Sequence, residues 1–192
     1  MMSRHSKSGN NGRTDRETPS LRQMGKIKYI PLAIVMSLFV IQNFIFNNSV
    51  VAAEIIYLTY ILTAVIGCAL TLIRSCIYGN KLTGKHTTSR FLASNIISGA
   101  LLLFTGFYGF LLASDVGRSL VVDQVVQVRA NLDNIGGAFV LQQPTIIDEK
   151  GNRVSLMFLL RLQYLHVGEK YHLRYAEHSG FILTAEITPH PQ

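Results

Sequence analysis

The stretch "RFLASNIISGALLLFTGFYGFLLASDVGRSLVVDQVVQVRA", residues 90–130, combines two structural periods in one continuous run. Residues 91–114 carry no charged side chain and lie between Arg90 and Asp115, which is typical of a helix that crosses a bilayer. From Ser119 onward, apolar and polar residues alternate, and this is the period of a half-buried β-strand. The fold is therefore expected to change from membrane helix to sheet close to Asp115.

Two further charge-free runs precede this stretch, at residues 29–53 and 55–73. A helix of about 19 residues rises roughly 28 Å, close to the thickness of the hydrocarbon layer. Buried helices of a soluble protein would need polar faces, and these runs have few polar positions. We therefore predict three transmembrane helices at about 30–46, 55–73 and 91–113, within a membrane region of residues 29–114.

The N-terminal segment, residues 1–28, is polar, basic and rich in Gly, Asn and Ser, which predicts a disordered cytoplasmic tail. A basic start followed by an apolar run also fits a cleaved signal peptide. Its basic region would be unusually long, however, and further apolar runs follow. We expect the first run to be retained as a helix.

The net charge of +7 is unevenly distributed. Seven Lys/Arg lie in residues 1–28 and four in residues 74–90, whereas the 47–54 turn has none. An excess of Lys/Arg marks cytoplasmic segments, so residues 1–28 and 74–90 are expected inside the cell and residues 115–192 outside the cytoplasm. The 74–90 segment alone gives the same location for residues 115–192 if the first run does not span. That domain is nearly neutral, which argues against nucleic acid as a partner.

The region after residue 114 predicts a small all-β domain. In "SLVVDQVVQVRA", residues 120, 122, 126, 128 and 130 are expected on one face of a strand. "AFVLQQPTIID" and "RVSLMF" flank the turn "DEKGN", while "LLRLQYLH" at 159–166 suggests a helical turn. Five or six short strands suit an SH3-like or OB-like barrel. Both cysteines lie before residue 115, so the domain has no disulfide.

The last hairpin, "HVGEKYHLRYAEHSGFILTAEI" at 166–187, spaces three histidines by six residues. Pairing Leu173 with Leu183 would put the large apolar residues on one face and Lys170, His172 and Arg174 on the other. Six extended residues separate His172 from His178 by about 20 Å, so the two are not expected to share a metal ion. We expect neither a metal nor a cofactor, and His172, Arg174 and His178 remain a possible partner surface.

Catalytic signatures are weak throughout the chain. "EHS" at 177–179 holds an acid, a base and a hydroxyl, but consecutive residues at a hairpin tip point apart. The sequence has no phosphate loop, dinucleotide fingerprint or HExxH motif. We expect no enzymatic activity.

The second predicted helix carries Thr59, Thr63, Gly67 and Thr71 at four-residue spacing. Small residues at this spacing allow two helix backbones to approach closely in lipid. The stripe is interpreted either as an interface with a partner protein or as packing between the second and third helices of this chain.

The string "VGEKYHLRYAEHSGFILTAEI", residues 167–187, resembles a pattern common to small membrane-tethered bacterial β-domains. Helices followed by a small barrel are also similar to the architecture of NfeD-type membrane proteins. The resemblance implies a bacterial membrane protein and transfers no site residue. We expect a non-enzymatic accessory or interaction protein of the cell membrane, possible roles being an immunity or protection factor or an assembly subunit of a secretion or transport complex.

Overall fold

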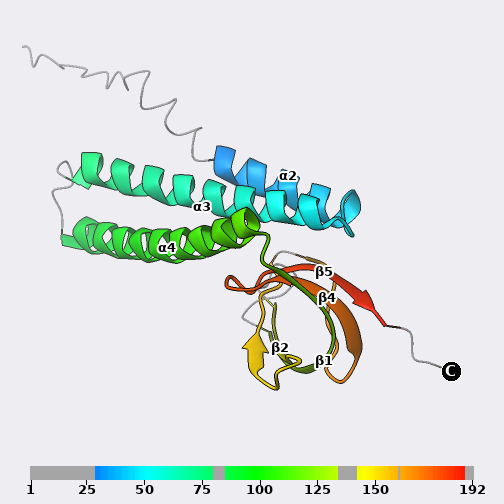
Figure 1. Ribbon diagram of the computed structural model, residues 1–192. Coiled ribbons are helices and arrows are strands. Elements are labelled where there is room, and N and C mark those ends of the chain that lie inside the picture. The colour runs from blue at the N-terminus through cyan, green and yellow to red at the C-terminus, as the bar shows by residue number, and fades with distance from the viewer. Residues whose placement is uncertain (1–28, 80–84, 134–141, 160, 189–192) are drawn as a thin grey trace, which may run out of the picture.

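The computed structural model describes residues 29–79, 85–133, 142–159 and 161–188. Within these residues three helices precede five strands, which confirms the predicted order of helices and sheet (Figure 1). The predicted tail at residues 1–28 lies outside the described residues. The elements are α2 (Ile30–Phe44), α3 (Val50–Gly79), α4 (Lys85–Arg118), β1 (Val121–Asp133), β2 (Gln142–Ile147), β3 (Arg153–Ser155), β4 (Lys170–Ala176) and β5 (Ile182–Ile187).

The two long helices extend beyond the apolar runs that predicted them. α3 has 30 residues and α4 has 34, so both continue past the charge-free runs into flanking polar residues. Both are long and apolar enough to cross a membrane. α2 has only 15 residues and rises about 22 Å, which is less than the hydrocarbon thickness, so three spans are not confirmed.

Local sequence signals set where α2 and α3 begin. Pro31 stands in the first turn of α2, where a missing N–H costs no hydrogen bond. The Ser49 hydroxyl accepts a hydrogen bond from the Ala52 N–H at 3.3 Å and caps α3. The turn between the two helices is therefore shorter than the predicted 47–54 segment, and Glu54 lies inside α3.

The two long helices lie side by side, with α2 along α3 (Figure 1). A Cβ placed on Gly109 of α4 would stand 2.5 Å from the Ile61 Cγ2 atom of α3. Only a glycine fits there without displacing α3. Gly109 therefore marks the point where the backbone of α4 comes closest to Ile61.

α4 ends in a Schellman motif. The Ser119 N–H donates to the Val116 carbonyl, the Leu120 N–H donates to the Asp115 carbonyl, and Ser119 has a φ of 55°. The left-handed conformation is favourable for glycine and strained for a residue with a Cβ. β1 begins at Val121, so helix and strand are joined by two residues.

We expect Ser119→Gly to stabilise the protein by up to about 1 kcal/mol, because it relieves the left-handed strain. Ser119→Val should destabilise it, since a β-branched side chain tolerates positive φ poorly. Denaturant unfolding of the detergent-solubilised protein measures both. A lower stability for the glycine variant than for wild type would contradict this account.

The strands form one antiparallel sheet in the order β3-β2-β1-β4-β5. The sheet is open and strongly curved, and the predicted closed barrel is not confirmed (Figure 1). Its two ends approach at a parallel bridge between Met157 and Phe181. A β-bulge between Val128 and Ala130 interrupts the alternation of β1, so Ala130 is exposed and not inward as predicted.

The segment predicted as a helical turn, residues 159–166, contains no helix in its described part. The Arg161 Nη2 atom donates to the Leu183 carbonyl at 2.6 Å, and the Gln163 Nε2 atom donates to the Ala185 carbonyl at 2.7 Å. These side chains hydrogen-bond two carbonyls along β5. They cover part of an edge that would otherwise be available to another strand.

The predicted faces of β4 agree with the structure, but the predicted pairing with β5 is wrong. Leu173 pairs with Ala185 instead of Leu183, and a bulge lies between Arg174 and Tyr175. The cause is that β5 is buried on both faces. Ile182 belongs to the core inside the sheet, whereas Leu183 packs toward the helices.

Candidate functional site

The candidate site is the junction where α3 and α4 meet the sheet. Its buried apolar residues come from both sides, and we refer to this cluster as the junction. They are Ala53, Ile56, Tyr57, Tyr60 and Ile61 of α3, Leu112 of α4, and Met157, Ala176, Phe181 and Leu183 of the β-domain. Sheet and helices therefore share one continuous core at this end of the helix pair.

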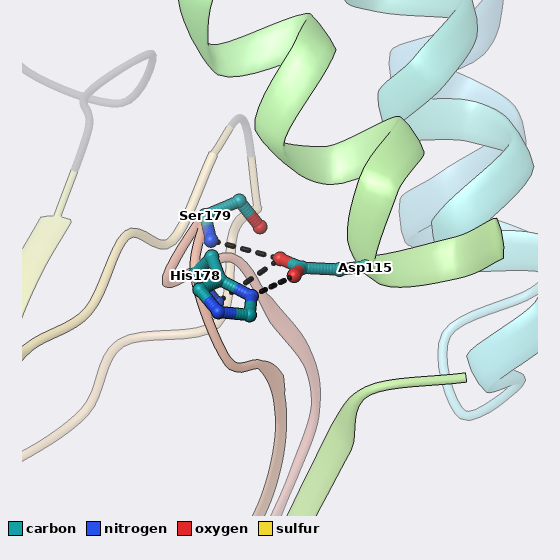
Figure 2. Close-up of polar contacts among 3 residues, drawn as sticks. All are labelled: Asp115, His178 and Ser179. Carbon is teal, nitrogen blue, oxygen red and sulfur yellow. Dashed lines mark hydrogen bonds and ion pairs between the residues drawn. The ribbon is translucent and has the colours of Figure 1, made fainter. Parts of the chain in front are cut away.

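Asp115, in the last turns of α4, connects the junction to the tip of the β4–β5 hairpin (Figure 2). Its carboxylate is fully buried and accepts hydrogen bonds from the His178 N–H at 3.1 Å and the Ser179 N–H at 2.8 Å. Its Oδ1 atom is hydrogen-bonded to His178 Nδ1 at 2.7 Å. An acid near a helix C-terminus opposes the helix dipole, so these three contacts must supply its stabilisation.

Asp115, His178 and Ser179 are the residue types of a hydrolytic triad, but their geometry differs from one. Figure 2 draws no interaction between the Ser179 hydroxyl and the imidazole. Ser179 Oγ is buried and has no hydrogen-bond partner among the described residues. Because a nucleophilic serine must be hydrogen-bonded to its base, this arrangement fits a structural contact between hairpin and helix.

Tyr57 provides a second polar contact across the junction. Its hydroxyl donates to the Ile182 carbonyl at 2.9 Å, and its ring lies 5.4 Å from the Phe181 ring centroid. The side chain is completely buried. The Cβ atoms of a helix point toward its N-terminus, so Tyr57 reaches from α3 toward the sheet near the N-terminal end of α3.

We expect Tyr57→Phe to lower stability by about 1 to 2 kcal/mol, because it leaves the buried Ile182 carbonyl without its partner while the ring packing is kept. Tyr164→Phe is the matched control, since Tyr164 is exposed. Unfolding free energies of both variants in detergent measure the difference. Equal losses would show that the Tyr57 hydrogen bond contributes nothing specific.

Two buried polar side chains lie next to the Tyr57 hydroxyl. Gln42 of α2 and Arg161 both lie beside it. Arg161 is only 3% exposed, and its guanidinium carbon lies 5.3 Å from the Phe158 ring centroid. Among the described residues, Arg161 Nε and Nη1 and both polar atoms of the Gln42 side chain have no hydrogen-bond partner.

After the contacts of Asp115 and Tyr57, a third polar contact joins the helices to the β-domain. It comes from α2: the Leu162 N–H donates to Asn43 Oδ1 at 2.9 Å.

The outer face of β1 and β4 carries a separate charged group. Asp123 contacts both His172 and Arg174, and the Arg174 Nε atom lies 2.7 Å from Asp123 Oδ2. Burial raises the pKa of Asp123, but hydrogen bonds from Arg174 and His172 outweigh it and hold that pKa below its ordinary value. The three side chains are solvent-exposed, so this pairing contributes little to stability.

We expect His172→Gln to raise the pKa of Asp123, because it removes the charge of one of the two partners. The carboxylate pKa can be followed by NMR titration. Since the folded-state pKa is depressed, the small stabilisation is present above the unfolded-state pKa and is lost as the pH falls through the folded-state value. An unchanged Asp123 pKa in the variant would contradict the assigned contact.

The three histidines of the last hairpin do not converge. His172 lies on the outer face of the sheet, His178 contacts Asp115 at the hairpin tip, and His166 is exposed in the preceding loop. Within the described part of the chain, no three His, Cys, Asp or Glu residues come close enough to hold a metal ion. Of the proposed partner surface, His172 and Arg174 lie together and His178 lies at the junction.

The Thr/Gly stripe of α3 is divided between different surroundings. Thr59 and Thr71 donate their hydroxyls to the carbonyls of Ile55 and Gly67 within the helix. Thr63 is buried, and a Cβ placed on Gly67 would lie 3.6 Å from Pro31 Cβ. At Gly67 the stripe therefore faces α2 of the same chain.

Sequence reasoning missed Asp115, Tyr57 and Arg161 as contact residues. The sequence pattern marks Asp115 only as the end of an apolar run, although an acid in the last turn of a helix opposes the helix dipole and is itself a signal. Gln42 and Asn43 lie in the first apolar run, where the sequence pattern assigns them no role. Asn43 in fact accepts a hydrogen bond from the β-domain, and Gln42 is buried beside Tyr57.

No protein-family model, curated protein or solved structure matches this chain.

Proposed function

We propose that this chain is a non-enzymatic integral membrane accessory protein that presents its β-domain, residues 115–192, to a protein partner outside the cytoplasm. The observation that carries this proposal is the junction. A buried carboxylate, a buried tyrosine and a shared apolar core fix the sheet to the ends of the two long helices. The charged outer face around Asp123, His172 and Arg174 remains exposed for a partner.

The orientation follows from charge. Arg74 and the loop after α3 belong to the basic 74–90 segment, and the excess of Lys/Arg favours the cytoplasm for that loop and for the N-terminal tail. α3 and α4 would then span the membrane, with α2 as a shorter third membrane helix. The curvature of the sheet and the Met157–Phe181 bridge support a small barrel-like domain on the outer side.

The two native cysteines make the orientation directly testable. Cys76 is exposed near the end of α3, and Lys150 is exposed in the turn between β2 and β3. In a Cys68→Ser background, a membrane-impermeant maleimide applied to intact cells should label the thiol introduced by Lys150→Cys and leave Cys76 unlabelled until permeabilisation. The reverse pattern would overturn the proposed orientation.

The partner surface is tested by photo-crosslinking in living cells. A photoreactive amino acid at position 172 should capture a protein of defined mass, and the same amino acid at position 150 should not. His172→Ala combined with Arg174→Ala should release the partner in mild detergent. If capture at position 172 equals that at position 150, this surface binds no specific partner.

The biological variants of the proposal predict different phenotypes. If the chain is an immunity or protection factor, its expression protects cells from a co-encoded toxin, and the captured protein is that toxin.

The second candidate is an assembly subunit of a membrane secretion or transport complex. Gly99 and Gly106 of α4 have no described atom within 4 Å of an added Cβ, so this side of α4 has space for a further helix. A subunit would migrate with a large complex in native gels, and Gly106→Leu should release it from that complex. Migration at the size of the isolated chain would exclude this candidate.

A further inference from the structure

The segment that follows β3 has two different sides. Arg161, Gln163 and Leu165 point toward the sheet: the first two hydrogen-bond the carbonyls of β5, and Leu165 is fully buried. The intervening Leu162 and Tyr164 are 54% and 43% exposed. This alternation is that of an extended chain, and it leaves an apolar outer side that the β-domain itself does not cover.

The exposed side continues onto the end of α2. The hydrogen bond from the Leu162 N–H to Asn43 places Leu162 against the last turn of that helix. Phe44 and Phe46, which follow Asn43, are also exposed. We call this surface the apolar rim, and its residues are Phe44, Phe46, Leu162 and Tyr164.

The depth of the rim relative to the bilayer follows from the positions of the charged residues of α3. Glu54 and Arg74 bracket its charge-free stretch, and the helical rise places them about 30 Å apart, which matches the hydrocarbon layer. Gln42 of α2 lies beside Tyr57, about one turn from Glu54, so the end of α2 and the rim next to it are at the outer boundary.

We propose that the apolar rim rests on the bilayer, between the lipid headgroups and the acyl chains, and holds the β-domain against the membrane surface. This inference rests on the membrane placement proposed above. The rim contains no charged side chain, and its aromatic residues are of the kind that favours the boundary region. The same lipid that surrounds the exposed apolar faces of α3 and α4 then continues over the rim, so no other partner is needed to cover it.

The chain contains no tryptophan, which makes one introduced indole a specific probe. Tyr164→Trp and Leu162→Trp report on the rim, and Val125→Trp, at an exposed position on the outer face of β1, is the matched control. The full-length variants are reconstituted in phosphatidylcholine vesicles with and without bromine on the acyl chains. The rim indoles should lose roughly half of their emission to the brominated lipid, and the control should lose almost none.

Two outcomes would overturn the inference. If the rim indoles are quenched no more than the control, the rim lies in water. If their emission is blue-shifted but insensitive to brominated lipid, protein covers the rim, for example a second copy of the chain. Resistance of the vesicle-bound protein to alkaline carbonate is measured in parallel. Retention with an unquenched rim rejects this inference alone, whereas release from the vesicles rejects the proposed membrane placement as well.

Discussion

Replacing Asp115 with alanine should destabilise the protein by about 3 kcal/mol or more. The His178 and Ser179 N–H groups would lose their acceptor, and a buried donor without a partner costs about 1 to 3 kcal/mol. The loss should be local first, because the carboxylate joins the hairpin tip to α4. Hydrogen exchange should therefore accelerate at the amides of the hairpin tip before the rest of the sheet.

Asp115→Asn separates hydrogen bonding from charge. The amide oxygen can accept both backbone N–H groups, and the amide nitrogen can donate to His178 Nδ1 in its unprotonated form. We therefore expect a loss below about 1 kcal/mol for this variant. Asp123→Ala is the matched control, since Asp123 also contacts a histidine but is exposed, and surface pairs contribute at most about 1 kcal/mol.

Denaturant unfolding of the four proteins in one detergent gives the comparison. The hydrogen-bond account predicts a large loss for Asp115→Ala and small losses for the other two variants. If alanine and asparagine at position 115 are equally destabilising, the contribution of Asp115 is its charge. If Asp115→Ala resembles Asp123→Ala, the contact has no structural role.

Gly109→Leu should lower stability by about 3 kcal/mol, because even the first carbon of the new side chain would stand 2.5 Å from Ile61 Cγ2. That methyl group is attached to a β-branched carbon and cannot move without a change of rotamer or of helix position. α3 and α4 would have to separate, and the apolar core of the junction would separate with them.

Gly106→Leu is the control for this variant, since position 106 lies one turn earlier on α4 and has no described atom within 4 Å of an added Cβ. We expect it to leave the stability of the isolated chain nearly unchanged. Ile61→Ala combined with Gly109→Leu should lose less than the sum of the single variants, because the leucine can enter the space left by the isoleucine. Additive losses would show that Ile61 is not the obstacle.

Sequence patterns predicted the elements whose residues face one environment. Tyr171, Leu173 and Tyr175 alternate with exposed residues because β4 has one buried face, and the prediction of that face agrees with the structure. The buried faces of β5 could not be predicted in the same way, since Phe181 and Leu183 pack against helices far away in the sequence. The run "FILTA" at 181–185 is nearly continuous in apolar residues, which indicates burial on both faces.

The contacts at the junction could not be predicted for a related reason. Tyr57 and Ile182 are 125 residues apart, and nothing in the sequence around either residue predicts their contact. The β-bulge between Arg174 and Tyr175 also shifts the pairing by one residue, and no turn signal encodes it. Local periodicity thus determines which residues are buried in each element, while the partner of each buried face depends on the assembled fold.

The interval from Gly109 to Asp115 on α4 has a further consequence. Gly109 fixes the rotation of α4 against α3, and Asp115 fixes the position of the hairpin tip against α4. Each residue of a helix turns the chain by about 100°. One inserted residue in this interval would swing the whole β-domain by that angle around the helix axis, away from Tyr57. The direction in which the sheet lies around the axis of α4 therefore depends on the number of residues between Gly109 and Asp115. It depends less on which residues they are.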